Sequence, residues 1–150
     1  MPGDEYLVAP GGIRIAADRF YHRDHYWILP DSPQPGHCRI GLSAYACRPG
    51  IEVYFVEHLP SPGSQVRAGE LLAVIETEKG VVSIHSPFDC QVLAVNRAVL
   101  EDPNCIGFDA YGVWILELRM PTAPQLLSPA EYLQYLRSLP PPQCFPAGKK

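Results

Sequence analysis

The octapeptide Ile-Glu-Thr-Glu-Lys-Gly-Val-Val at residues 75–82 carries the most informative local pattern in the chain. Apolar residues run up to Thr77, a charged apex follows at 78–80, and apolar residues resume at Val81. This pattern predicts two antiparallel strands joined by a tight turn. Lys79 would then stand at the tip of the hairpin, accessible and held by a rigid frame. Most lysines in such turns are simply solvated, so a function for Lys79 depends on what flanks it.

The segments around the hairpin also read as strands. Residues 51–58 alternate between apolar and polar side chains, which is the pattern of a half-buried strand. Residues 19–29 end in an aromatic and apolar run suited to a strand. Seventeen prolines and twelve glycines cut the chain into short segments, which favours strands and turns over a helical bundle. Further strands are expected at residues 37–42, 71–77, 81–85, 91–95 and 113–118.

A weak internal repeat flanks the hairpin. Ser-Pro-Gly-Ser-Gln-Val at 61–66 and Ser-Pro-Phe-Asp-Cys-Gln-Val at 86–92 differ by one inserted residue. Two similar half-motifs on either side of one hairpin suggest a sandwich with approximate two-fold symmetry.

The remaining segments divide the chain into a domain with two tails. Residues 1–19 read as an N-terminal extension lying along the domain, and residues 140–150 as a flexible tail. Residues 43–50 suggest one short helical turn capped by Ser43, and residues 96–112 a long connection rich in turns. Ser128, Pro129 and Glu131 form an N-terminal capping signature, which predicts a helix over 129–139. Residues 20–139 therefore form one domain, mainly β with a C-terminal helix.

Composition excludes several classes of function. The 12 basic and 16 acidic residues are scattered, so no nucleic-acid partner is expected. No apolar run is long enough for membrane insertion, and the N-terminus lacks a secretory signal, so we expect a cytoplasmic protein. The five cysteines contain no Cys-x-x-Cys pair, which predicts free thiols and no metal site. No spacing of histidine and cysteine singles out a catalytic dyad, so the chain is not expected to be an enzyme.

From residue 21 to residue 139, the ordered motifs resemble the H protein of the glycine cleavage system, a lipoyl carrier. The family's lipoylated Glu-Ser-x-Lys-Ala corresponds to residues 76–80, and its tyrosine followed by His-Glu-Trp to Tyr21 and residues 25–27. Further matches in the same order are Gly41 to Ala46, Tyr54 to Pro60 with one inserted residue, Ser86-Pro87, Asp102-Pro103, Ala110-Tyr111-Gly112, Trp114 and Glu131-Tyr132.

The resemblance implies the lipoyl-domain fold, a hammerhead barrel-sandwich hybrid, and a lipoate covalently attached to Lys79. A lipoate ligase or lipoyl transferase would recognise the hairpin through Glu76, Thr77, Glu78 and Gly80. Acylation neutralises the lysine and lengthens its arm, and the dithiolane opens to two thiols that carry a group. Biotin carriers share the fold, but methionines flank their lysine, so biotin is disfavoured here.

Departures from the family pattern bear on the cargo. H proteins have a glutamate between the histidine and the tryptophan, understood to help hold the aminomethylated arm in a surface cleft, and this chain has Tyr26 there. Asp24 or Glu57 would have to replace that carboxylate. His85, six residues beyond Lys79, is the other candidate for the arm's cleft. Cys90 and Cys105 are candidate accessory thiols, although most such cysteines are small buried apolar residues.

These departures, together with the N-terminal extension, are most similar to the lipoate-binding proteins of sulfur-oxidising prokaryotes. The leading hypothesis is thus a non-catalytic carrier of sulfur intermediates that works with a heterodisulfide-reductase-like complex. One alternative is an H protein that carries an aminomethyl group among the glycine cleavage enzymes; dihydrolipoamide dehydrogenase is a further candidate partner. The other alternative is an unmodified interaction module.

Overall fold

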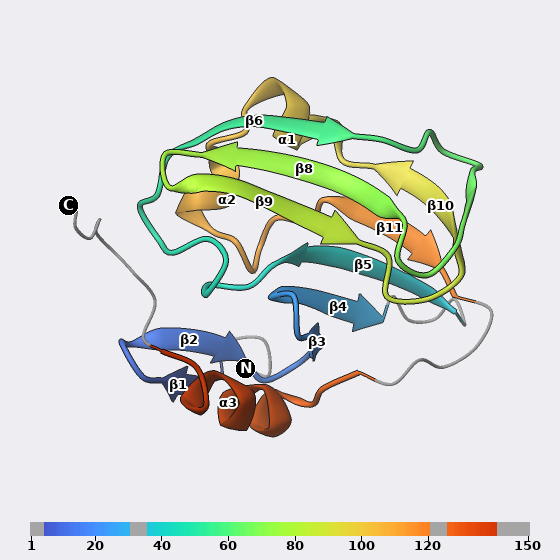
Figure 1. Cartoon of the computed structure of the whole chain (residues 1–150). Helices are drawn as coiled ribbons and strands as arrows, with labels where there is room; N and C mark the ends of the chain where they lie inside the picture. The colour runs from blue at the N-terminus through green and yellow to red at the C-terminus, as the bar shows by residue number, and fades with distance from the viewer. Residues whose placement is uncertain (1–4, 31–35, 121–125, 141–150) are drawn as a thin grey trace.

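Two β-sheets face each other in the computed structural model, which describes residues 5–30, 36–120 and 126–140 (Figure 1). The smaller sheet has the strand order β6-β8-β9 and the larger one β3-β4-β5-β11-β10-β7. The strands of the smaller sheet are β6 (Val53–His58), β8 (Leu71–Thr77) and β9 (Gly80–His85). Those of the larger sheet are β3 (Phe20–His22), β4 (Tyr26–Pro30), β5 (His37–Leu42), β7 (Gln65–Val66), β10 (Cys90–Val95) and β11 (Leu116–Arg119).

The main core lies between the sheets. Apolar side chains from both contribute, such as Val56, Ile75 and Ile84 from the smaller sheet and Ile40 and Leu118 from the larger. Each of these side chains is at most a few per cent exposed. Full burial of such a side chain stabilises the fold by about 1.5–3 kcal/mol before the entropy of ordering is subtracted.

The two halves of the internal repeat meet at the end of the larger sheet. Strand β7 pairs antiparallel with β10, so that Val66 lies opposite Cys90. Just beyond this pair, Gly63 N–H donates to the Val92 carbonyl at 2.7 Å, and Val92 N–H donates to the Ser64 carbonyl at 2.9 Å. The similar segments thus bind each other directly.

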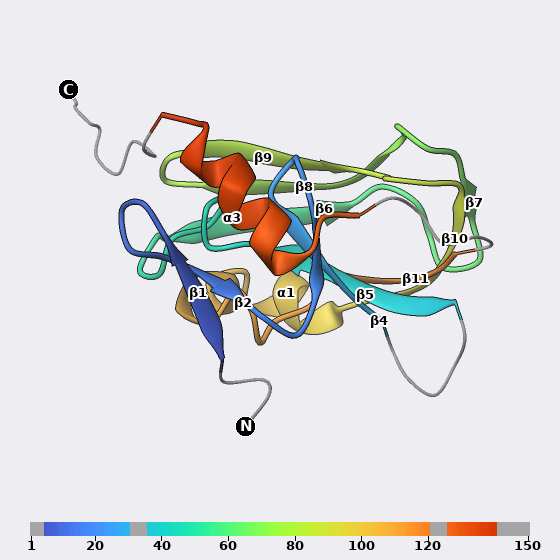
Figure 2. The ribbon, with the colours of Figure 1, turned by 90° about the horizontal axis from the view of Figure 1, so that it is seen from below.

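A second, smaller core lies outside the sandwich, between the N-terminal hairpin and the C-terminal helix. The hairpin of β1 (Tyr6–Ala9) and β2 (Ile13–Ala16) packs against helix α3 (Pro129–Arg137) below strand β4 (Figures 1 and 2). The rings of Tyr21 and Tyr132 stack at 4.5 Å within it. The predicted N-terminal extension is therefore a β-hairpin that completes this core.

The predicted N-terminal cap of α3 is present. Ser128 Oγ accepts from Glu131 N–H at 3.1 Å, and the Glu131 carboxylate accepts from Ser128 N–H at 2.8 Å. The helix ends at Arg137, two residues before the predicted end, and Tyr132 and Leu136 are its buried residues. The expectation of a mainly β chain with a C-terminal helix is confirmed.

Two local expectations need correction. The run at 19–29 ends in β4 as expected, but its first part forms a separate strand, β3, and the chain turns at residues 23–25. The segment at 96–112 is not only turns, because it contains α1 (Arg97–Glu101) and α2 (Cys105–Phe108). Asn96 caps α1 by accepting from Ala98 N–H at 3.0 Å, a signal present in the sequence. The single turn expected after Ser43 is confirmed: the Ser43 carbonyl accepts from Cys47 N–H at 3.0 Å, and Ser43 Oγ accepts from Tyr45 N–H at 3.3 Å.

The predicted tail falls almost wholly outside the described residues, of which residue 140 is the last. Within the described ranges, no helix is both long enough and apolar enough to cross a membrane.

Candidate functional site

Lys79 lies at the tip of the hairpin that joins β8 to β9. Thr77 pairs with Gly80 across the hairpin, so Glu78 and Lys79 form a two-residue turn. Residues 78–80 are all exposed. The hairpin and the position of its lysine are as the sequence predicts.

Hydrogen bonds on both sides hold the backbone of the tip. Thr77 Oγ1 accepts from Lys79 N–H at 3.0 Å and donates to the Gly80 carbonyl at 3.0 Å. Glu78 N–H donates to the Glu52 carbonyl at 3.0 Å, while the Glu78 carboxylate accepts from Glu52 N–H at 2.8 Å. Thr77 therefore closes the turn from within, and Glu78 ties it to the residue before β6. The base of the lysine arm is fixed in one geometry.

Glu76 and Gly80 have different places at the tip. Glu76 is exposed on the outer face of the smaller sheet, opposite Val81 on β9 and Phe55 on β6. Gly80 has φ +129, which favours glycine, and an added Cβ would meet nothing within 4 Å. Its constraint is thus conformational rather than steric.

A groove of about 560 Å³ begins beside this tip and follows β9. One wall is β9 itself from Val81 onward, so the groove starts two residues after Lys79. The opposite wall comes from the turn after β3, the turn after Ser43 and helix α3. The residues lining the groove are Arg23, Asp24, His25, Tyr45, Ala46, Val81, Val82, Ser83, His85 and Tyr135.

Of the two residues predicted for an arm cleft, the structure places only His85 in the groove wall. Tyr26 is fully buried and does not line the groove. Its ring stacks on His22 at 4.8 Å, and its hydroxyl donates to the His85 carbonyl at 2.8 Å. Burial raises the pKa of Tyr26 far above its usual value, so the phenol is neutral. Tyr26 supports the groove wall from beneath.

Asp24 supplies a carboxylate to the groove. Its backbone N–H donates to His22 Nδ1 at 3.0 Å, and its Oδ2 lies 3.6 Å from the same nitrogen. Burial lowers the pKa of His22, so this imidazole is neutral at pH 7 and does not pair with Asp24 as a cation. Arg23, the preceding residue, lines the same groove. Glu57, the other candidate carboxylate, lies on β6 opposite Val74 and does not line the groove.

His25 links the groove to helix α3. Its φ of +72 is a left-handed conformation, uncommon outside glycine and asparagine. The ring stacks on Tyr45 at 4.1 Å, and Nδ1 lies 2.8 Å from the Tyr132 hydroxyl, which in turn lies 2.8 Å from Ser43 Oγ. Burial lowers the pKa of His25 to about 4, so the ring is neutral at pH 7.

The neutral state of His25 makes stability depend on pH. In the unfolded chain a histidine titrates near pH 6.5, so between pH 6.5 and 4 the unfolded state binds a proton that native His25 does not. Stability therefore falls as the pH drops through this window. In a comparison of urea unfolding at pH 7 and pH 4, we expect His25→Asn to lose less stability than the parent, by roughly 2 kcal/mol after allowance for solvent screening. Asparagine tolerates the positive φ.

The same comparison contains its control. The pKa values of His22 and His58 are also lowered by burial, and these residues keep their share of the pH dependence in the variant. Equal losses of stability in the parent and in His25→Asn would contradict the assignment to His25.

The candidate accessory thiols lie outside the groove. Cys90 is buried at the start of β10, with its sulfur 3.4 Å from Ser86 Oγ, and Cys105 is half-buried at the start of α2. Burial raises the pKa of both thiols, so both are protonated at neutral pH and poorly nucleophilic. Cys38, Cys47, Cys90 and Cys105 are free, while Cys144 lies outside the described residues. Within the described ranges, no group of three metal-ligating side chains occurs.

The positions of the lysines in the sequence are a further signal for the modification site. The chain has 12 basic residues, but its lysines are Lys79, Lys149 and Lys150 alone. From residue 1 to residue 148, every cationic side chain except Lys79 is an arginine. Arginine stays protonated and is not acylated as an amine is. The folded body therefore presents one lysine amine, at the hairpin tip.

Comparison with known proteins agrees with the geometry. The family model described as "Glycine cleavage H-protein" matches residues 19–139. A glycine cleavage system H protein of Rubrobacter xylanophilus is 37% identical over 81% of this chain and 94% of its own length. That of Caldanaerobacter subterraneus is 31% identical over 84% of this chain and all of its own length. The crystal structure of a glycine cleavage system H protein from Mycobacterium marinum, 32% identical, superposes with a TM-score of 0.66 over 79% of this chain and 95% of that one.

Proposed function

The chain belongs to the glycine cleavage H-protein family, and from this premise we propose that it is a lipoyl carrier, modified on Lys79, that serves glycine cleavage enzymes. Its barrel-sandwich fold is that of the family. The observation that carries the proposal is the exposed Lys79 on a fixed hairpin, with a groove that begins beside it. The role is that of a carrier between enzymes rather than of an enzyme.

The residues present fit a covalent lipoate. Lys79 is exposed, its backbone is fixed by Thr77 and Glu78, and the body offers no second lysine. Attached lipoate would supply two thiols that carry a group and can return to a disulfide. Val81 and Val82 offer an apolar wall for the neutral arm, and the groove beyond them leads to polar side chains. A lipoate ligase or lipoyl transferase would meet the acidic residues Glu76 and Glu78 beside the lysine.

The carboxylate in the groove favours an aminomethyl cargo. Glutamate is absent between the histidine and the tryptophan, but Asp24, two residues earlier, lines the groove. A charged amine beside Asp24 would gain a charge-assisted hydrogen bond. The buried phenol of Tyr26 then holds the wall rather than the cargo. The function supported best is therefore transfer of an aminomethyl group among the glycine cleavage enzymes, with dihydrolipoamide dehydrogenase as the partner that reoxidises the thiols.

The proposal is tested by glycine decarboxylation with the lipoylated chain and the other glycine cleavage enzymes. We expect turnover, and we expect Asp24→Asn to lower the rate about tenfold, the value of one charge-assisted bond. Glu57→Gln is the matched control, because Glu57 lies outside the groove, and it should retain the parent rate. Failure of the fully lipoylated parent chain to support the reaction would overturn the aminomethyl assignment.

That failure would favour the sulfur-carrier hypothesis. One observation speaks for it, namely that tyrosine occupies the position of the family's glutamate. The relatives reported above are named as glycine cleavage H proteins, and the thiols of Cys90 and Cys105 are protonated and outside the groove. A heterodisulfide-reductase-like partner therefore rests on sequence resemblance alone, and a cytoplasmic location remains a prediction.

We expect Gly80→Val to impair the lipoylation of Lys79 more than the stability of the fold. Valine at φ +129 is strained, but its side chain would enter open space, so we expect a stability loss of only about 1–2 kcal/mol. Relief of the strain would displace the neighbouring Lys79 from its fixed geometry. Lipoylation by a ligase, followed by intact mass, should therefore slow by more than tenfold. A lipoylation rate equal to that of the parent would show that the ligase does not require this turn.

A further inference from the structure

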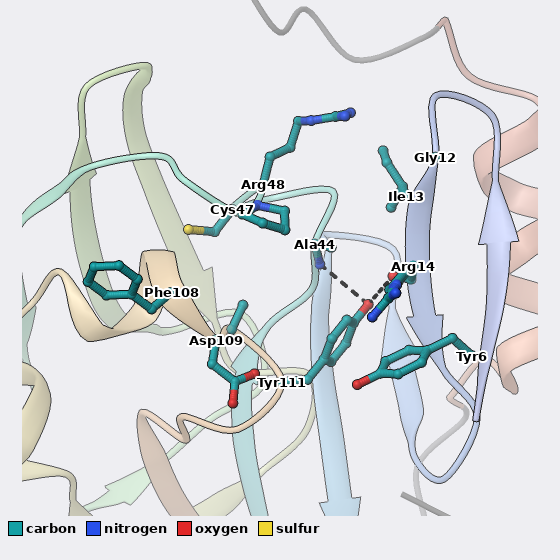
Figure 3. Close-up of a pocket in the computed structure, with 12 residues that line it drawn as sticks. Tyr6, Gly12, Ile13, Arg14, Ala44, Cys47, Arg48, Phe108, Asp109 and Tyr111 are labelled. Atoms are coloured by element: carbon teal, nitrogen blue, oxygen red, sulfur yellow. Dashed lines mark hydrogen bonds between the residues drawn. The ribbon is translucent and has the colours of Figure 1, made fainter. Parts of the chain in front are cut away.

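A second cavity, of about 390 Å³, lies away from Lys79 and depends on the N-terminal hairpin (Figure 3). Its walls come from β1 and β2, from the turn at 44–49 and from residues 108–111. The hairpin precedes residue 19, where the match to the family model begins. The cavity is thus closed on one side by a segment outside that match.

Hydrogen bonds fix the hairpin to the body around the cavity. The Tyr111 hydroxyl donates to the Arg14 carbonyl at 2.5 Å and accepts from Ala44 N–H at 3.4 Å (Figure 3). Arg48 Nη2 donates to the Gly11 carbonyl at 3.1 Å, across the turn of the hairpin. The cavity is therefore preformed, which lowers the entropic cost of ligand binding.

Aromatic rings and small apolar groups form most of the surface. Tyr6 and Tyr111 contribute rings 5.9 Å apart, and Ile13 and Ala44 lie between the hairpin and the body. Phe108 at the rim is 80% exposed, the highest value among the exposed large hydrophobic residues. A flat apolar ligand would cover surface that is now in contact with water.

The charge of the lining is positive. Arg14 and Arg48 contribute two guanidinium groups against the single carboxylate of Asp109, which already accepts from Gly112 N–H at 3.0 Å. Arg48 Nη1 is buried and, within the described ranges, has no hydrogen-bond partner. In the same ranges, neither arginine lies within 4.0 Å of a carboxylate. Buried N–H groups of a cation are costly to leave unpaired, and an anionic oxygen would satisfy them.

We propose that this cavity binds a small organic anion with a flat apolar ring, either an aromatic carboxylate or an aryl phosphate. The ring would lie against Tyr6 and Tyr111, and the anionic oxygens would face Arg14, which lies beside both rings (Figure 3). Arg48 adds positive charge on another side of the cavity. This site goes beyond the carrier function and does not depend on the modification of Lys79.

The test is an NMR titration of the full ¹⁵N-labelled chain with phenylacetate and phenyl phosphate. We expect saturable shifts at the amides of Gly12, Ala44, Asp109 and Tyr111, with Kd on the order of 1 mM, an ordinary affinity for a ligand of about ten heavy atoms. The tighter of the two probes distinguishes a carboxylate ligand from a phosphate ligand. The neutral 2-phenylethanol and the cationic 2-phenylethylamine should bind at least tenfold more weakly.

Two variants with opposite expected effects complete the test. Arg14→Met keeps the length of the side chain and should weaken both anions about tenfold, whereas Asp109→Asn keeps the bond to Gly112 N–H and should tighten them about threefold. Arg67→Met, an exposed arginine outside the cavity, is the matched control and should change nothing. The proposal is overturned if neutral and anionic probes bind equally, if no saturable shifts occur in the millimolar range, or if Asp109→Asn weakens the anions.

Discussion

Replacing Lys79 with arginine should abolish lipoylation completely while leaving the fold intact. The side chain is exposed and keeps its charge and nearly its length, so we expect a change in stability within about 0.5 kcal/mol. Arginine offers no amine that a ligase can acylate. Intact mass after expression with lipoate and a ligase should show one lipoyl increment on the parent chain and none on Lys79→Arg.

The scarcity of lysine makes this comparison unusually clean. The other lysines are Lys149 and Lys150, and replacing both with arginine should leave the full increment in place. A mass increment that persists in Lys79→Arg and disappears in the double variant would move the attachment to the C-terminal end. A parent chain that gains no mass would leave the unmodified interaction module as the remaining alternative.

A large loss of stability from a single methyl group is expected at Gly41. Gly41 lies directly opposite Trp27 on the paired strands β5 and β4, and an added Cβ would overlap the indole ring at Cζ2 and Cε2. Trp27 cannot move aside easily, because its Nε1 donates to the Ala110 carbonyl at 3.0 Å and the Arg19 guanidinium lies 4.6 Å over its ring. We expect Gly41→Ala to cost about 3 kcal/mol, measured by urea unfolding.

Gly50→Ala separates the steric effect from the conformational one. Gly50 has φ +92 and open space around its missing Cβ, so alanine there costs only the strain of the left-handed conformation, about 1–2 kcal/mol. Gly41 has no such φ, so its cost is entirely contact with Trp27. If Gly41→Ala lowers the free energy of unfolding by no more than Gly50→Ala does, then the contact between residue 41 and the Trp27 ring is not a steric constraint on β4 and β5.

Local signals in the sequence were sufficient for the parts of the fold that depend on neighbouring residues. The hairpin at Lys79 follows from alternation interrupted by a charged apex, and α3 follows from Ser128, Pro129 and Glu131. Strand β3 was missed because it is only three residues long and is separated from β4 by a turn in which His25 has φ +72. A positive φ at histidine leaves no mark in the hydrophobic pattern.

The candidate site was predictable only in part, because sequence patterns report on neighbouring residues and not on residues that the fold brings together. Lys79 and its neighbours are contiguous, so one stretch of sequence contains the whole tip. The groove instead combines Asp24, Tyr45, His85 and Tyr135, which come from four separate elements. Alternation along β4 does not predict which way Tyr26 points, because the first three residues of the strand are all buried and both of its faces are therefore covered. Asp24, which lines the groove, lies in the turn before this strand.

The second core also constrains how the chain can fold during synthesis. Its residues come mainly from the hairpin near the N-terminus, from β3 and β4 and from α3, so Ile15 and Tyr21 must wait for Tyr132 and Leu136 to be translated. The larger sheet has a similar requirement, because β11 pairs between β5 and β10. Long-range pairing of this kind is slow to form. The second core should thus form only after α3 has been translated, and truncation before residue 129 should leave the apolar face of the N-terminal hairpin without the helix that covers it.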